Sequence, residues 1–160
     1  MLPLDGVPSG QGAQTKPYAW LATPYDERNA QFSPDGRWVA YQSNESGRFE
    51  IYAAPFLGPG GKRQISTDGG TYPRWRADGR EIFYVSSNNT LAAAAVSVSG
   101  ASLEVGAVRA LGIPGFAGAT SYMYDVSADG QRFLVAAPRE QKASTPLTLI
   151  QNWPALLNRK

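Results

Sequence analysis

The chain has 160 residues, a formal charge of +2 and 42% apolar residues, so it is long enough for a sizeable core and too apolar for a disordered chain. It contains no histidine and no cysteine. This composition excludes a Ser-His-Asp triad, a thiol nucleophile and the usual ligands of zinc, haem and iron–sulfur centres.

The first expected strands lie before residue 23. Met1–Gly6 is typical of the end of a third strand, and Tyr18–Ala22 of a fourth strand. Residues 7–16, rich in Gly, Ser and Gln, form the loop between them. Met1–Gly6 has neither the basic stretch nor the apolar run of a signal peptide, so no signal peptide is expected at this end.

A ten-residue motif then occurs three times. The copies start at residues 32, 75 and 126 and read FSPDGRWVAY, WRADGREIFY and VSADGQRFLV. Their aspartates, Asp35, Asp78 and Asp129, are 43 and 51 residues apart. These spacings are close to the ~40–50 residues of one propeller blade.

Asp-Gly between two apolar runs is a strong hairpin signal, because glycine adopts a positive φ without a Cβ clash and the carboxylate accepts nearby backbone N–H groups. Each copy therefore predicts a short strand, a tight turn and a longer strand. A third strand is expected at 49–53, 91–97 and 147–151, and a fourth strand at 63–66 and 108–111. No segment shows convincing helical periodicity, so the chain is expected to be all-β.

These elements predict a partial β-propeller of about three four-stranded antiparallel blades. The expected divisions are half-blade strands and a loop (1–22), blade 1 (23–66), blade 2 (67–111), an incomplete blade 3 (112–153) and a tail (154–160). Closed propellers have about 4–8 blades, so the chain is expected to be a C-terminal piece of a larger propeller.

The first repeat carries a family resemblance. The string from Phe32 to Tyr41 resembles the WD40-like (PD40) β-propeller repeat of TolB-like proteins, and residues 42–52 and 60–75 are close to the same family. The similarity covers roughly residues 15 to 155 and is closest to the C-terminal propeller of certain bacterial Ser/Thr protein kinases. The third repeat departs from it, with Val126 in place of the aromatic residue and Ala128 in place of the proline. The resemblance implies a periplasmic or extracytoplasmic location for the full-length parent, and none of the kinase's catalytic motifs is present.

Three functions are compatible with these observations. The first is a non-catalytic propeller that binds a protein, peptide or small ligand as a sensor or scaffold, and it is the one we expect. The second is a propeller accessory to a prolyl-oligopeptidase-like hydrolase, and the third is a carboxylate-based propeller glycosidase, for which the non-turn Asp125 is a candidate residue. The Asp-Gly aspartates are interpreted as turn residues, and Trp38 and Trp75 as packing between blades.

The candidate binding surface is the propeller face made by loops between second and third strands and between consecutive blades. Exposed aromatic residues mixed with arginine favour binding. The candidate residues are Glu27, Arg28, Asn44, Glu45, Arg48, Tyr72, Arg74, Asn88 and Tyr122.

A protein or peptide partner is expected at this surface, and no cofactor or metal. No nucleic-acid partner is expected, because no basic run exceeds two residues outside mixed patches. No membrane insertion is expected either, because the longest apolar run, Leu91 to Val96, is far shorter than the ~20 residues of a membrane span. Unpaired strand edges also predict a homodimer, in which Tyr18–Ala22 of each copy joins the 123–151 sheet of the other and completes a six-bladed ring.

Overall fold

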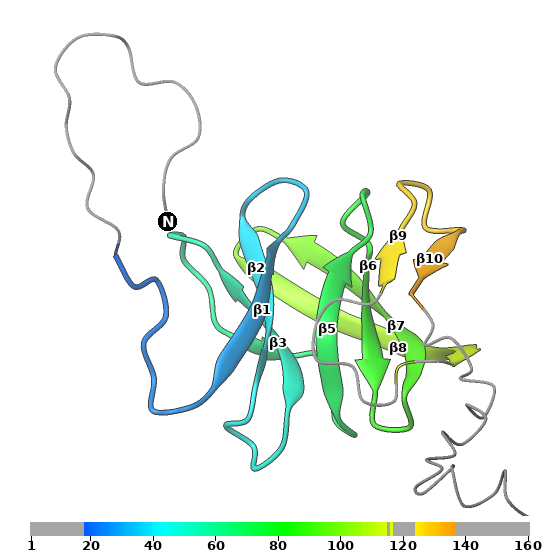
Figure 1. The fold of residues 1–160 in the computed structure, drawn as a ribbon. Coiled ribbons are helices and arrows are strands. Elements are labelled where there is room, and N and C mark those ends of the chain that lie inside the picture. Colours follow the sequence, from blue (N-terminus) through cyan, green and yellow to red (C-terminus); the bar gives the residue numbers. More distant parts are fainter. Residues whose placement is uncertain (1–17, 115, 117–123, 137–160) are drawn as a thin grey trace, which may run out of the picture.

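The computed structural model describes residues 18–114, 116 and 124–136, and this part of the chain is built from strands without any helix (Figure 1). Its strands form two four-stranded antiparallel sheets and one two-stranded hairpin. The expected all-β fold is therefore confirmed. Within the same residues, no helix has the length and apolar character needed to cross a membrane.

The first sheet, sheet A, is a simple meander in which each strand pairs with the next along the chain. Its strands are β1 (Glu27–Phe32), β2 (Trp38–Ser43), β3 (Glu50–Pro55) and β4 (Arg63–Gln64). The third and fourth strands lie where the sequence predicts them, and the fourth is shorter than expected.

The second sheet, sheet B, repeats the same order. Its strands are β5 (Gly70–Trp75), β6 (Glu81–Ser86), β7 (Thr90–Ser99) and β8 (Ser102–Pro114). Strand β8 extends well beyond the predicted 108–111 at both ends. A tight turn at Gly100 lets β7 and β8 pair from Ser99 and Ser102 onward, which lengthens the ladder.

The third repeat forms a hairpin of β9 (Tyr124–Val126) and β10 (Phe133–Val135). The strands expected at Met1–Gly6 and 147–151 lie outside the described residues. Tyr18–Ala22 is described, and the expectation of a strand there is wrong for the single chain. The Trp20 ring instead packs edge-on against the Tyr41 ring, with centroids 6.0 Å apart, because an apolar sheet face buries it better than a strand edge does.

All three Asp-Gly turns have the predicted conformation. Gly36, Gly79 and Gly130 have φ angles of 70°, 72° and 69°. Each glycine N–H donates to the carbonyl three residues earlier, over 2.9, 2.9 and 2.8 Å. The preceding aspartate accepts the N–H two residues further along the chain, over 3.1, 3.0 and 3.0 Å. These carboxylates therefore hold the turns, as predicted.

The first strand of each sheet contains a β-bulge at the same repeat position. In β1 the register shifts between Arg28 and Gln31, and in β5 between Thr71 and Arg74. The residue six positions before the turn aspartate, Asn29 or Tyr72, has a φ of 55° in both bulges. Asparagine adopts this left-handed conformation readily, whereas tyrosine does so rarely.

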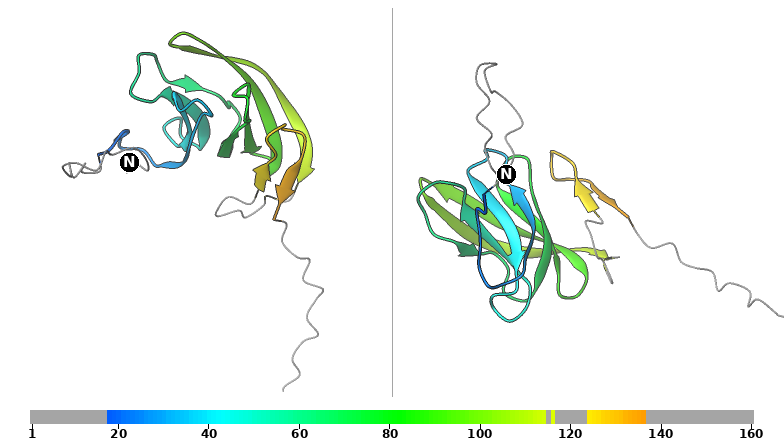
Figure 2. Two further views of the ribbon diagram at one scale, coloured as in Figure 1. Left: turned by 90° about the horizontal axis from the view of Figure 1, so that it is seen from above. Right: turned by 60° about the vertical axis from the view of Figure 1, so that its left-hand side comes forward.

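Two apolar clusters join the three parts, which follow one another face to face (Figure 2). The first junction, between sheets A and B, includes Trp38 and Trp75, so their predicted role in packing is confirmed. The second junction, between sheet B and the hairpin, includes Phe83, Leu91 and Tyr124.

Candidate functional site

Two of the predicted binding residues, Asn44 and Asn88, use their side-chain oxygens for hydrogen bonds within loops. The Asn44 side-chain oxygen accepts the Asp26 N–H over 3.0 Å and fixes the segment that enters β1. The Asn88 side-chain oxygen accepts the hydroxyl groups of Ser86 and Thr90, both over 2.6 Å, and closes the loop between β6 and β7. Both amides therefore hold the backbone in place.

Three predicted charged residues form local polar pairs. Arg28 binds Asp26 and, mainly through this hydrogen bond, lowers the pKa of the Asp26 carboxyl. The Lys62 ammonium donates to Glu45 Oε1 over 2.6 Å, and the Thr23 hydroxyl donates to Glu27. Exposed ion pairs of this kind contribute little to stability. They do not bring the predicted residues together into one site.

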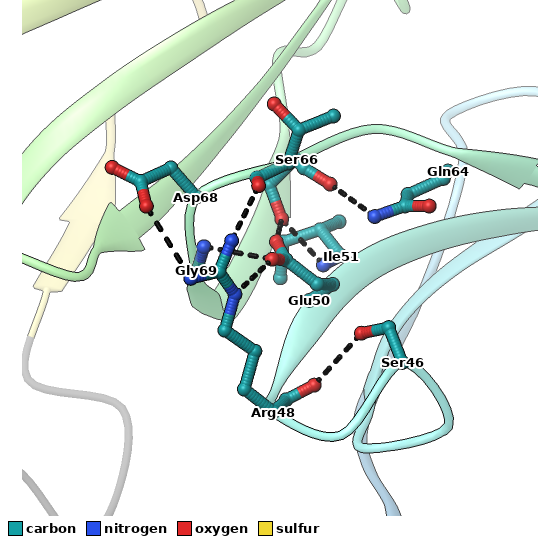
Figure 3. A network of polar contacts seen from close by, with 9 residues as sticks. Ser46, Arg48, Glu50, Ile51, Gln64, Ser66, Asp68 and Gly69 are labelled. Carbon is teal, nitrogen blue, oxygen red and sulfur yellow. Dashed lines mark hydrogen bonds and ion pairs between the residues drawn. The ribbon is translucent and has the colours of Figure 1, made fainter.

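Arg48 lies at the exposed edge of a polar network around a buried carboxylate, which was not predicted from the sequence (Figure 3). Its partner Glu50 is fully buried at the start of β3. Glu50 accepts Arg48 Nε over 2.8 Å, the Gly69 N–H over 2.8 Å and the Ser66 hydroxyl. Ser66 Oγ in turn accepts the Ile51 N–H over 2.8 Å. This Glu50 network ties β3 to the segment that leads into sheet B.

Two predicted aromatic residues give no exposed site. Tyr72 is buried in the second junction rather than exposed, because the bulge in β5 turns it toward the hairpin. Its backbone carbonyl accepts the Tyr124 hydroxyl over 2.7 Å. Tyr122 lies outside the described residues.

Arg74 is the predicted residue that the structure places in a shared cluster. Its Nη1 donates to Gln31 Oε1 over 3.3 Å, and its Nε lies 4.0 Å from Asp125 Oδ1. These three residues stand at one repeat position, four before the turn aspartate, on β1, β5 and β9. We call them the inner row. In the sequence, the inner row is marked by the shared spacing of its three residues from their turn aspartates.

A small cleft lies beside the inner row. Its volume is about 180 Å³, and its walls include Gln31, Arg74, Trp75, Asp125 and Val126. Pockets for drug-sized ligands and cofactors have volumes of about 300–1,000 Å³. The inner cleft therefore has room for a single side chain of a partner, bordered by an amide, a cation, an anion and apolar walls.

A larger groove, of about 660 Å³, lies between sheets A and B at the end that carries the Asp-Gly turns. Asp35, Asp78, Trp38 and Trp75 line it. Because strands alternate in direction, this end is opposite to the predicted binding loops. The groove therefore lies at an end of the sheets where no binding residue is predicted from the sequence.

The chemistry of the groove does not favour acid catalysis. The Ser33 hydroxyl donates to Asp35 over 2.6 Å, and this bond is the main reason that the pKa of Asp35 is below its ordinary value. A general acid needs a raised pKa. Across residues 18–114, 116 and 124–136, no group of three or more acidic side chains could hold a metal ion.

Comparison with known proteins gives no assignment: no family model matches the chain, and no curated protein matches it.

Proposed function

We propose that the chain is part of a non-catalytic, TolB-like β-propeller that binds a protein or peptide partner, as a sensor or scaffold module. Support for the propeller comes from the repetition itself. Sheets A and B share their strand order, their Asp-Gly turn and the bulge in their first strand. The apolar faces of successive sheets pack on one another, as blades of a propeller do. An extracytoplasmic location is part of the same proposal.

The observation that carries the binding role is the inner row. Three consecutive repeats bring equivalent side chains, Gln31, Arg74 and Asp125, to one place on their first strands. In a propeller the first strand of each blade lies nearest the central channel, so such a row faces a space shared by all blades. Arginine beside apolar walls is typical of residues that dominate protein interfaces.

The carboxylate-based glycosidase has less support. Asp35, Asp78 and Asp129 accept backbone N–H groups within their own turns. Asp125 forms an ion pair with Arg74, whose Nε lies 4.0 Å from Asp125 Oδ1, whereas glycoside hydrolysis uses two carboxyl groups that flank the scissile bond.

The test is selection of peptides from a random library displayed on phage. Enriched peptides are synthesised with a fluorescent label, and their dissociation constants are measured by fluorescence polarisation. We expect Arg74→Ala and Gln31→Ala to weaken binding about tenfold or more, because both line the inner cleft. Arg109→Ala is the matched control, since Arg109 is exposed on the outermost strand β8.

Circular dichroism and thermal melts of each variant establish that the fold is retained. The proposal fails if no peptide is enriched. It also fails if the selected peptides bind folded Arg74→Ala and Arg109→Ala as tightly as the parent.

A further inference from the structure

The bulges in β1 and β5 share one hydrogen-bond acceptor. Gln42 of β2 is 3% exposed, and its Oε1 accepts Asn29 Nδ2 over 2.9 Å and the Tyr72 N–H over 3.0 Å. Because a backbone N–H can only donate, the Gln42 atom that faces Tyr72 is the oxygen. An amide oxygen has two lone pairs, and each bulge supplies one donor to it. A single buried side chain therefore ties the bulge of sheet A to the bulge of sheet B.

Both bulge residues lie two positions before a member of the inner row. Asn29 precedes Gln31 in β1, and Tyr72 precedes Arg74 in β5. A displacement of either bulge is therefore carried along the same strand to the inner row. The contact between Gln31 Oε1 and Arg74 Nη1, which is 3.3 Å long, depends on how closely the two bulges are held together.

The second junction shows the inner row without this tie. Val85 of β6 stands seven residues after its turn aspartate, as Gln42 does, and its side chain has no acceptor. In that junction Arg74 Nε and Asp125 Oδ1 are 4.0 Å apart, which is beyond hydrogen-bonding distance. In the first junction Arg74 Nη1 donates to Gln31 Oε1. The closer contact in the row occurs where the shared acceptor is present.

We infer that Gln42 is a positioning residue for the inner cleft, because it sets the spacing of Gln31 and Arg74 and thereby the affinity for the partner. The inference rests on the proposed function, since it takes the inner cleft to be the binding site. Gln42 is buried and does not line the cleft, so it acts through the two bulges. Its neutral amide satisfies both donors without the cost of burying a charge.

The test uses a peptide selected on the parent chain, with its dissociation constant measured by fluorescence polarisation. Gln42→Met removes the acceptor and keeps the length of the side chain, and it should weaken binding about fivefold or more. Gln42→Glu keeps an acceptor oxygen for both bulges, so its folded form should bind nearly as tightly as the parent. Gln64→Met is the matched control, since Gln64 is exposed on β4, at the opposite edge of sheet A from β1.

The Nε–Hε resonance of Arg74 in isotope-labelled protein is a readout that needs no ligand. Gln42→Met should shift this resonance, and Gln64→Met should leave it unchanged. A residue that only stabilised the fold would lower the melting temperature and change neither the resonance nor the affinity of the folded protein.

Asn29→Gly decides the question if circular dichroism shows that Gln42→Met does not fold. Glycine keeps the positive φ of the bulge and removes the Nδ2 donor, so one of the two bulges is released from Gln42. This variant should shift the Arg74 resonance and weaken binding in the same direction as Gln42→Met.

The inference is overturned if folded Gln42→Met binds the peptide as tightly as the parent or keeps the parent's Arg74 resonance. Equal weakening by Gln64→Met, or by folded Gln42→Glu, also overturns it. Failure of the proposed function is a separate outcome, in which no peptide is enriched or Arg74→Ala binds as tightly as the parent. In that case the Arg74 resonance still reports whether Gln42 positions the inner row.

Discussion

The first and second junctions differ in chemistry although the same repeat builds both. In the first junction the Gln42 side-chain oxygen accepts the Tyr72 N–H over 3.0 Å, and the Glu50 network adds charged contacts. In the second junction the position of Gln42 is taken by Val85, and the contacts are mostly apolar. The repeat therefore sets the geometry of the sheets, while single positions decide whether a junction depends on polar or apolar contacts.

The largest loss of stability is expected from a substitution that disrupts the second junction. Phe83 is fully buried there, and its ring lies edge-on to Phe133 at 5.1 Å. Phe83→Ala should lower the free energy of unfolding by about 3–5 kcal/mol, because it removes buried apolar surface and leaves a cavity. Urea denaturation measures the loss. Val108→Ala, at an exposed site, should change it by less than about 0.5 kcal/mol.

The next largest loss of stability is expected from a substitution in the first junction. Glu50→Ala should cost about 2–4 kcal/mol, because the Gly69 N–H and the Ser66 hydroxyl lose their buried acceptor. The control is Glu104→Ala, an exposed carboxylate that accepts the Ser102 hydroxyl over 3.0 Å. Equal stability of the two variants in urea would show that the Glu50 network does not stabilise the junction.

A smaller effect compares two turns of identical conformation. A Cβ at Gly130 would lie 2.8 Å from Arg76 Nε, whereas a Cβ at Gly36 would have no neighbour within 4 Å. Gly36→Ala should cost about 1 kcal/mol through its positive φ alone. Gly130→Ala should cost more, because Arg76 must also move. Thermal melts compare the two variants, and equal melting temperatures would mean that Arg76 adds nothing to the third turn.

The smallest expected effect is a change in how the stability of the fold depends on acidic pH. The Ser33 hydroxyl lowers the pKa of Asp35 below its ordinary 3.8, so this bond stabilises the fold above about pH 4 and is lost as the pH falls through the lower folded pKa. Ser33→Ala should therefore lose less stability than the parent on acidification. Its stability at pH 7 should also be lower, because the buried Trp38 N–H, which donates to Ser33 Oγ over 2.9 Å, loses that acceptor. Urea midpoints at pH 7 and pH 3 measure this, with Ser102→Ala as control. A Ser33→Ala variant with the parent's acid dependence would contradict the assignment.

Local signals predicted much of the fold. Asp-Gly turns and alternating apolar residues depend on neighbours along the chain, and they located the strands of both sheets. The bulge that buries Tyr72 and the burial of Glu50 depend on contacts between segments far apart in sequence. No spacing rule reveals that a glutamate beside Phe49 lies inside the molecule.

The candidate site was predicted less well than the fold. The sequence predicts polar loop residues such as Asn44 and Asn88 to be exposed binding groups, but their hydrogen bonds stabilise the loops themselves. Arg74 was chosen for its arginine chemistry and does lie in the inner cleft. Its partners Gln31 and Asp125 come from other repeats, so only the aligned repeat positions could have pointed to them.

The backbone of Tyr72, whose φ is 55°, links docking of the hairpin to the position of Arg74. Its N–H is held by Gln42 of sheet A, its carbonyl by Tyr124 of the hairpin, and Arg74 follows two residues later. Docking of the hairpin therefore helps to hold the backbone that positions Arg74. If Arg74 holds the proposed partner, binding of that partner would strengthen the docking of the hairpin. By reciprocity, undocking of the hairpin would then weaken binding of the partner by the same factor.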